Sequence, residues 1–134
     1  MKLKINLLLF ALLALDFCLS GLTLFDPGKW VQLMHGSTVA DPLGLVPRMG
    51  AGWAAFFLIQ LIAFLRWERR PDWLAVVAGV RFTELFCDWV YLYFADSISS
   101  FGRIGLALSP PVNLLAGWYL LRAFRRLNRG QSSS

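Results

Sequence analysis

The sequence has few charged residues, two cysteines and one histidine, and each scarcity excludes something. Charged residues make up 16% of the chain, whereas soluble domains contain about 25%. The cysteines, Cys18 and Cys87, have neither a CxxC spacing nor a histidine cluster around them, so we expect no metal site and predict no cofactor. The expected helices contain no histidine, and we assign no catalytic residue.

Apolar residues dominate instead, at 57% of the chain with 15% aromatic. A bilayer core about 30 Å thick requires about 20 apolar residues in a helix. The continuous apolar runs do not alternate as the strands of a membrane barrel would. We therefore predict an all-α polytopic membrane protein, a single domain over residues 1–134 that forms a bundle of four transmembrane helices. The helices are expected at about 5–25, 49–65, 73–95 and 104–121, with an outer loop at 26–48 and a disordered tail at 128–134.

The basic residues are distributed unevenly between the two ends of the expected helices. Nine lysines and arginines lie on the side of both chain ends, whereas Lys29, Arg48 and Arg103 lie on the other. The positive-inside bias then makes both termini cytoplasmic, in a multi-pass protein of the cytoplasmic (inner) membrane. Because the net charge of +5 follows this pattern, we expect the lipid bilayer, and no nucleic acid, as partner.

The first segment also has the basic start and apolar run of a signal peptide. The apolar stretch continues to Phe25 and no A-x-A cleavage site follows it. We expect this segment to remain as a helix; cleavage would leave three helices.

The third segment contains RFTELFCDWVYLYF, residues 81–94, in which three charges interrupt an apolar helix. At about 100° per residue, Arg81, Glu84, Asp88 and Tyr91 lie within about 80° of one another. A charge at the bilayer centre costs about 2.5 to 3.5 kcal/mol, so this stripe should face the bundle interior. Arg81 is expected to pair with Glu84 or with Asp16.

Helix depth brings further polar residues to the same level. At a rise of about 1.5 Å per residue, Asp16, Glu84 and Asn113 lie within about 2 Å of the midplane. Small residues such as Gly50 allow close helix packing, and a kink at Pro110 and Pro111 is expected to open a polar cavity. We predict a central ligand-binding cluster of Asp16, Gln60, Arg81, Glu84, Asp88 and Asn113.

The outer loop contains KWVQLMHG, which is expected to form a short interfacial helix with Trp30, Leu33 and Met34 on one side. A lone histidine such as His35 in this loop is usually an ordinary interfacial residue. Alternatively, as a lid over the outer mouth of the bundle, the loop would place His35 near Arg48 or Asp88. On the opposite side, Trp67 in the short loop between the second and third expected helices is predicted to lie at the cytoplasmic membrane interface.

The stretch SGLTLFDPGKW at the end of the first segment and the RMG at the start of the second resemble the DoxX-like group of small four-helix bacterial membrane proteins. The carboxylates of TELFCD are similar to those of the EXPERA group of four-helix membrane proteins. The first resemblance implies an accessory role beside quinone-linked oxidoreductases. The second implies binding or isomerising a flat hydrophobic molecule.

Three functions stay open. The cluster binds a hydrophobic small molecule, such as a quinone or an isoprenoid lipid, with Arg81 and Asn113 donating hydrogen bonds to a carbonyl, alone or as an accessory subunit of a redox or lipid-handling complex. Alternatively, the charges only fix helix packing in a structural subunit. A third reading makes Glu84 and Asp88 the acid and base of an isomerase, or part of a proton path. A homo-oligomer or a larger membrane complex is compatible with each.

Overall fold

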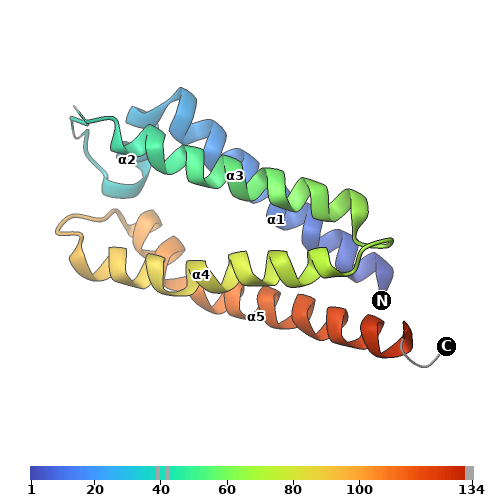
Figure 1. Ribbon diagram of the computed structural model, residues 1–134. Coiled ribbons are helices and arrows are strands. Elements are labelled where there is room, and N and C mark those ends of the chain that lie inside the picture. The colour runs from blue at the N-terminus through green and yellow to red at the C-terminus, as the bar shows by residue number, and fades with distance from the viewer. Residues whose placement is uncertain (39, 42, 132–134) are drawn as a thin grey trace.

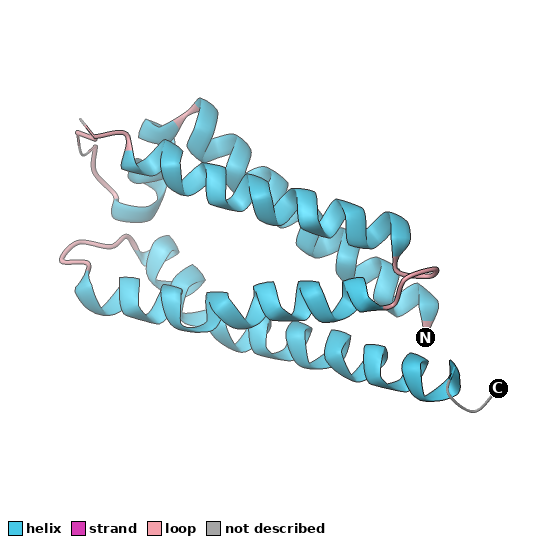
Figure 2. Ribbon diagram, viewed as in Figure 1, coloured by secondary structure: helices cyan, strands magenta, loops and turns pink. Residues whose placement is uncertain are grey.

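The computed structural model describes residues 1–38, 40–41 and 43–131. Over these residues the fold is all-helical, with five helices and no strand, as Figure 2 shows. The predicted all-α fold is therefore confirmed. The helices are α1 (Lys2–Phe25), α2 (Pro27–His35), α3 (Leu45–Arg66), α4 (Asp72–Phe94) and α5 (Ser100–Gln131).

Three of these helices are long and apolar enough to cross a membrane. They are α1, α3 and the Ser100–Arg129 part of α5. Helix α4 is 23 residues long, which corresponds to about 35 Å, but it contains Arg81, Glu84 and Asp88 in its middle. The length of α4 matches the prediction, and its charges set it apart from the other three.

The long helices form two side-by-side pairs (Figure 1). Helix α1 packs along α3, and α4 packs along α5. The N-terminus, the 67–71 turn and the C-terminal end of α5 lie at one end of the bundle, and α2 lies at the other. At the first end, Lys2 Nζ and Glu68 Oε2 are 2.9 Å apart.

Of two buried apolar clusters, the smaller lies around α2 and the larger lies near the end with the chain termini. Ile5, Leu9, Leu74 and Leu120 are fully buried there. Trp67 is only 2% exposed, and its Nε1 donates a hydrogen bond of 2.7 Å to Asn6 Oδ1. Trp67, which the sequence placed among the interfacial aromatic residues, is thus turned into the bundle at the end of α3, where Asn6 provides the polar partner of its indole.

Many large apolar side chains face outward. Phe17, Phe86, Leu108, Leu115 and Trp118 are all at least 57% exposed. Large exposed apolar side chains on helices of this hydropathy are typical of helices that contact lipid. Cys18 and Cys87 are also exposed, without a disulfide between them.

The connection between α1 and α3 contains the expected short helix, with a different buried face. Asp26 caps α2 by accepting a hydrogen bond from Lys29 N at 3.1 Å. Trp30, Val31 and Met34 are buried, whereas Leu33 is 39% exposed. Leu33 therefore does not belong to the packed side, because the buried face is centred on Met34: at about 100° per residue Trp30 and Val31 lie about 40° and 60° to either side of it, and Leu33 lies about 100° away.

Helix α5 is longer than predicted at both ends. It runs through Pro110 and Pro111 without interruption and continues to Gln131, into the segment expected to be disordered. Leu127 packs against the core from this extension, which explains why the helix continues. The rest of the predicted tail, residues 132–134, lies outside the described residues.

Candidate functional site

A buried ion pair joins the two helix pairs. Arg81 Nη2 on α4 donates to Asp16 Oδ2 on α1 at 2.7 Å, and the two side chains are 1% and 2% exposed. Of the two partners predicted for Arg81, the structure selects Asp16. An ion pair without water around it is favourable only when further hydrogen bonds satisfy its remaining groups.

Side chains from the other two long helices, α3 and α5, form some of these further hydrogen bonds. Gln60 Nε2 on α3 donates to Asp16 Oδ2 and, at 3.0 Å, to the carbonyl of Phe56. Arg81 Nη1 donates to Asn113 Oδ1 on α5 at 3.4 Å, and Asn113 Nδ2 donates to Ser109 Oγ at 3.0 Å. Four helices thus meet in one network, which we call the ion-pair network: Asp16, Gln60, Arg81, Asn113 and Ser109.

Two buried polar atoms of the ion-pair network have no hydrogen-bond partner. They are Gln60 Oε1 and Arg81 Nε. Buried polar atoms are almost always satisfied in folded proteins, so each orphan atom requires an explanation. Gln60 Oε1 is a hydrogen-bond acceptor, and Arg81 Nε is a donor.

The predicted cluster separates into two groups. Asp16, Gln60, Arg81 and Asn113 are bonded to one another. Glu84 and Asp88 lie on the same face of α4, are only partly buried, and form no ion pair within the described part of the chain. Arg81 therefore forms its ion pair with Asp16, and the two α4 carboxylates have no ion-pair partner within the described part of the chain.

Glu84 and Asp88 line two adjoining cavities. The polar cavity, about 350 Å³, also reaches Asp16, Arg81 and Asn113. The aromatic cavity, about 400 Å³, is lined by Trp30, Trp53, Phe56 and Tyr91 among others. Besides the two carboxylates, both cavities share Met34, Trp53 and Leu106. We call these two cavities together the chamber.

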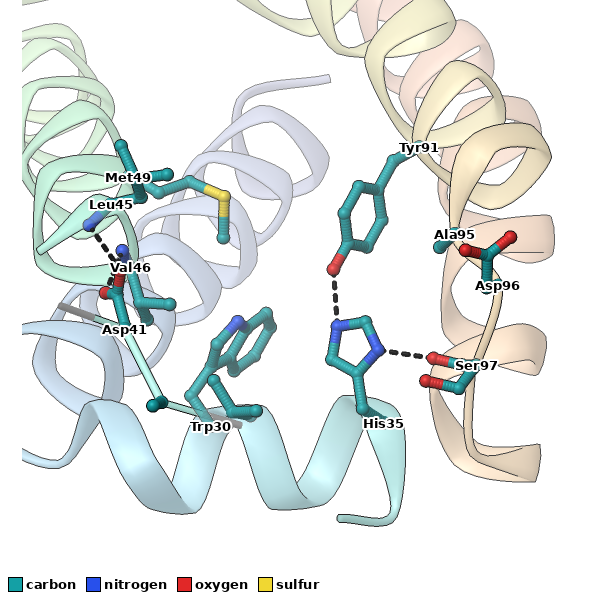
Figure 3. A pocket seen from close by; sticks show the side chains of 12 residues that line it. Trp30, His35, Asp41, Leu45, Val46, Met49, Tyr91, Ala95, Asp96 and Ser97 are labelled. Atoms are coloured by element: carbon teal, nitrogen blue, oxygen red, sulfur yellow. Dashed lines mark hydrogen bonds between the residues drawn. The ribbon is translucent and has the colours of Figure 1, made fainter. Parts of the chain in front are cut away.

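A third cavity continues the chamber toward α2. This α2 cavity has a volume of about 490 Å³ and shares Trp30, Met49 and Tyr91 with the aromatic cavity. In Figure 3, Trp30 and Met49 lie on one side of it, and Tyr91 and His35 face each other on the other side. His35 Nε2 and Tyr91 Oη are 2.6 Å apart, and His35 Nδ1 contacts the Ser97 carbonyl (Figure 3).

His35 therefore does not lie where the sequence placed it. It contacts Tyr91 and Ser97, and neither Arg48 nor Asp88. The reason is a set of hydrogen bonds that fixes the C-terminal end of α2 to the segment before α5. Ser99 N donates to the Met34 carbonyl at 2.8 Å, and Ser99 Oγ donates to the Leu33 carbonyl at 2.6 Å. Helix α2 thus bridges the two helix pairs at this end of the bundle.

The sequence analysis missed the aromatic walls of the chamber. Trp53, Phe56 and Gln60 lie on one face of α3, because their spacings of three and four residues correspond to successive helical turns. That spacing was visible once Gln60 had been placed in the interior. The cavity beside Ser109 and Asn113 was expected, and it is present although α5 continues through its two prolines.

Among the described residues, no group of three His, Cys, Asp or Glu side chains is placed to hold a metal ion. The chain matches no protein-family model, and its comparison with curated proteins and with solved structures gives no significant match. The site therefore rests on its own geometry: a helical protein with three helices apolar enough for a membrane, and a chamber that ends at buried charges.

Proposed function

We propose that this chain is a multi-pass protein of the cytoplasmic membrane that binds a hydrophobic small molecule in the chamber. The observation that carries the proposal is the chamber itself, which has apolar and aromatic walls and a few polar groups at one end. Ligand sites commonly have this composition, and the space between helices of a bundle is a usual place for them. A quinone or an isoprenoid lipid has the matching apolar body.

The membrane topology of the proposal has four spans, with α4 among them and both termini in the cytoplasm. It is supported by the position of the two chain ends at one end of the bundle (Figure 1). An even number of spans returns the chain to its starting side, whereas three spans would separate the ends. The charges of α4 are compatible with a helix that crosses the membrane, because Arg81 is paired with Asp16 and the carboxylates of Glu84 and Asp88 line cavities.

A retained ligand can be detected directly. Native mass spectrometry with lipid extraction should find a specific molecule on the gently purified protein. Replacing Glu84 by Gln should reduce the retained molecule by about tenfold or more, because it changes the charge of a side chain that lines both cavities of the chamber while the side-chain shape is kept.

The matched control is Asp72→Asn, which removes a carboxylate from the exposed start of the same helix, outside the chamber. Asp72→Asn should retain the ligand at the wild-type level. A wild-type protein that carries no specific molecule, or variants that carry equal amounts of it, would contradict the proposal.

The second candidate function is a structural subunit whose charges fix helix packing. It is favoured by one observation, the closed hydrogen bonding of Arg81 to Asp16 and Asn113, which leaves both Nη atoms engaged within the protein. An accessory role in a larger redox or lipid-handling complex, with or without self-association, is supported only by the DoxX-like resemblance. In both candidate functions the ion-pair network is structural. The two functions differ in whether Glu84 and Asp88 contact a ligand.

A further inference from the structure

The charges that line the chamber do not balance. Asp16 and Arg81 neutralise each other at 2.7 Å. Arg48, which also lines the chamber, is exposed and pairs with neither Glu84 nor Asp88 in the described chain, so these two carboxylates have no ion-pair partner. These carboxylates are one helical turn apart on α4, a spacing at which like charges repel. Each lines both the polar and the aromatic cavity. An unpaired carboxylate in apolar surroundings is costly, and a cation placed between the two offsets that cost.

The walls next to these carboxylates are those that organic cations prefer. Trp30 and Trp53 meet edge to face with their ring centroids 5.3 Å apart, and Phe56 and Tyr91 line the same cavity. The faces of aromatic rings attract amines and quaternary ammonium groups, most strongly when the cation is shielded from water. Trp30 is only 9% exposed, so this part of the cavity is shielded.

A second, independent observation indicates a ligand in the polar cavity. Arg81 lines that cavity and is 1% exposed, and its Nε has no hydrogen-bond partner. The orphan N–H requires an acceptor, and the nearby carboxylate of Asp16 already serves Nη2. A ligand oxygen that reaches the polar cavity would satisfy the Nε of Arg81 while the cationic group stays between the carboxylates and the rings.

We infer that the chamber takes a lipophilic organic cation, an amine or quaternary ammonium compound, with its charge beside Glu84, Asp88 and the aromatic rings. This inference rests on the proposed function and narrows its ligand class. Arg48 also lines the aromatic cavity, but it is exposed and forms no ion pair with either carboxylate in the described chain. Because Arg48 carries the same charge as the ligand, it weakens cation binding. Replacing Arg48 by a neutral residue should therefore strengthen binding, whereas replacing Glu84 or Asp88 should weaken it.

The test uses the full chain in phosphatidylcholine nanodiscs, with empty nanodiscs as blank. Tetraphenylphosphonium and the smaller benzyltrimethylammonium serve as cationic probes, and tetraphenylborate as the anion of matched shape. Binding is followed by tryptophan fluorescence, since Trp30 and Trp53 line the chamber, and by protection of Cys87 from a thiol reagent. Cys18 is the internal control, because it is exposed and lies outside the chamber.

The expected result is saturable binding of at least one cation, with protection of Cys87 and not of Cys18. Glu84→Gln and Asp88→Asn should each weaken it about tenfold or more, Asp72→Asn should leave it unchanged, and Arg48→Gln should tighten it. Preference for tetraphenylborate, or cation binding that Glu84→Gln, Asp88→Asn and Arg48→Gln all leave unchanged, would overturn the inference. So would failure of both cations when mass spectrometry still finds a neutral molecule in the chamber; the proposed function would then stand. A chamber that holds neither would overturn both.

Discussion

At the scale of single residues, Arg81 explains why an apolar bundle contains charges. Its guanidinium is fixed by Asp16 and Asn113, and its carbon Cζ lies 5.9 Å from the centroid of the Phe56 ring. Arginine suits such a position because its planar fork donates several hydrogen bonds at once. The pair therefore holds α1 and α4 in one register, and removing either charge alone leaves the other buried without compensation.

The first prediction at this scale concerns the stability of that pair. Arg81→Met should lower the free energy of unfolding by about 3 to 5 kcal/mol, because Asp16 is left buried and unpaired. The double variant Asp16→Asn, Arg81→Met should recover most of this loss, since no charge then remains in the interior. Chemical unfolding in mild detergent, followed by circular dichroism, measures both.

The control is the surface pair Lys2 and Glu68, whose side chains are 72% and 49% exposed. Lys2→Met should change the unfolding free energy by less than about 1 kcal/mol, as exposed pairs contribute little. Additive losses in the Asp16 and Arg81 double variant would show that the two charges do not depend on each other.

The sequence predicted which residues occupy the bundle interior and did not predict how they pair. Helix rise fixed the depth of Asp16, Glu84 and Asn113, and periodicity fixed the inward face of α4. Neither quantity describes how far one helix is rotated relative to its neighbour. Glu84 and Asp16 therefore remained equal partners for Arg81, and only the packed helices distinguish them.

At the scale of elements, the α1 and α3 pair depends on a close contact at Gly50. A side chain there would overlap the Thr23 hydroxyl and bring a Cβ atom 3.0 Å from Thr23 Cβ. Thr23 is fully buried, and its Oγ1 donates to the Leu19 carbonyl at 2.7 Å, so it cannot move away. The small-residue pattern around Gly50 in the sequence predicted this approach.

The prediction at this scale compares two glycines of α3. Gly50→Val should lower the free energy of unfolding by about 1 to 3 kcal/mol, the range of overpacked interiors, because it pushes α1 away. Gly52→Val should have little effect on the same measurement, since nothing lies within 4 Å of its added Cβ. Equal stabilities of the two variants would mean that this contact does not hold the pair together.

Local signals predicted the helices better than their ends and contacts. The apolar residues of KWVQLMHG indicated α2, yet the position of its C-terminal end depends on Ser99, 66 residues beyond Leu33. Such a long-range hydrogen bond leaves no periodic trace in the sequence. The same limit explains why His35 was expected near Asp88 and lies against Tyr91 instead.

At the scale of the whole molecule, the two helix pairs are joined at both ends. Trp67 and the apolar core close the end with the chain termini, and α2 bridges the other. The chamber lies between these closures, with the ion-pair network beside it. This arrangement places the carboxylates of α4 that lack an ion-pair partner inside the bundle. The proposed topology therefore has α4 crossing the membrane beside the three more apolar helices.

The last prediction tests that crossing with single cysteines in a chain without Cys18 and Cys87. Glu68→Cys marks the turn before α4, Ser97→Cys the segment after it, and Asn128→Cys the end of α5. With four spans and cytoplasmic termini, an impermeant maleimide should label only Ser97→Cys in intact spheroplasts, and Glu68→Cys and Asn128→Cys after lysis. If α4 lay along the surface with the other three helices crossing, Ser97→Cys would be protected and Asn128→Cys labelled. The two topologies thus exchange the labelling of two positions, and the second pattern would remove α4, with its carboxylates, from the membrane interior.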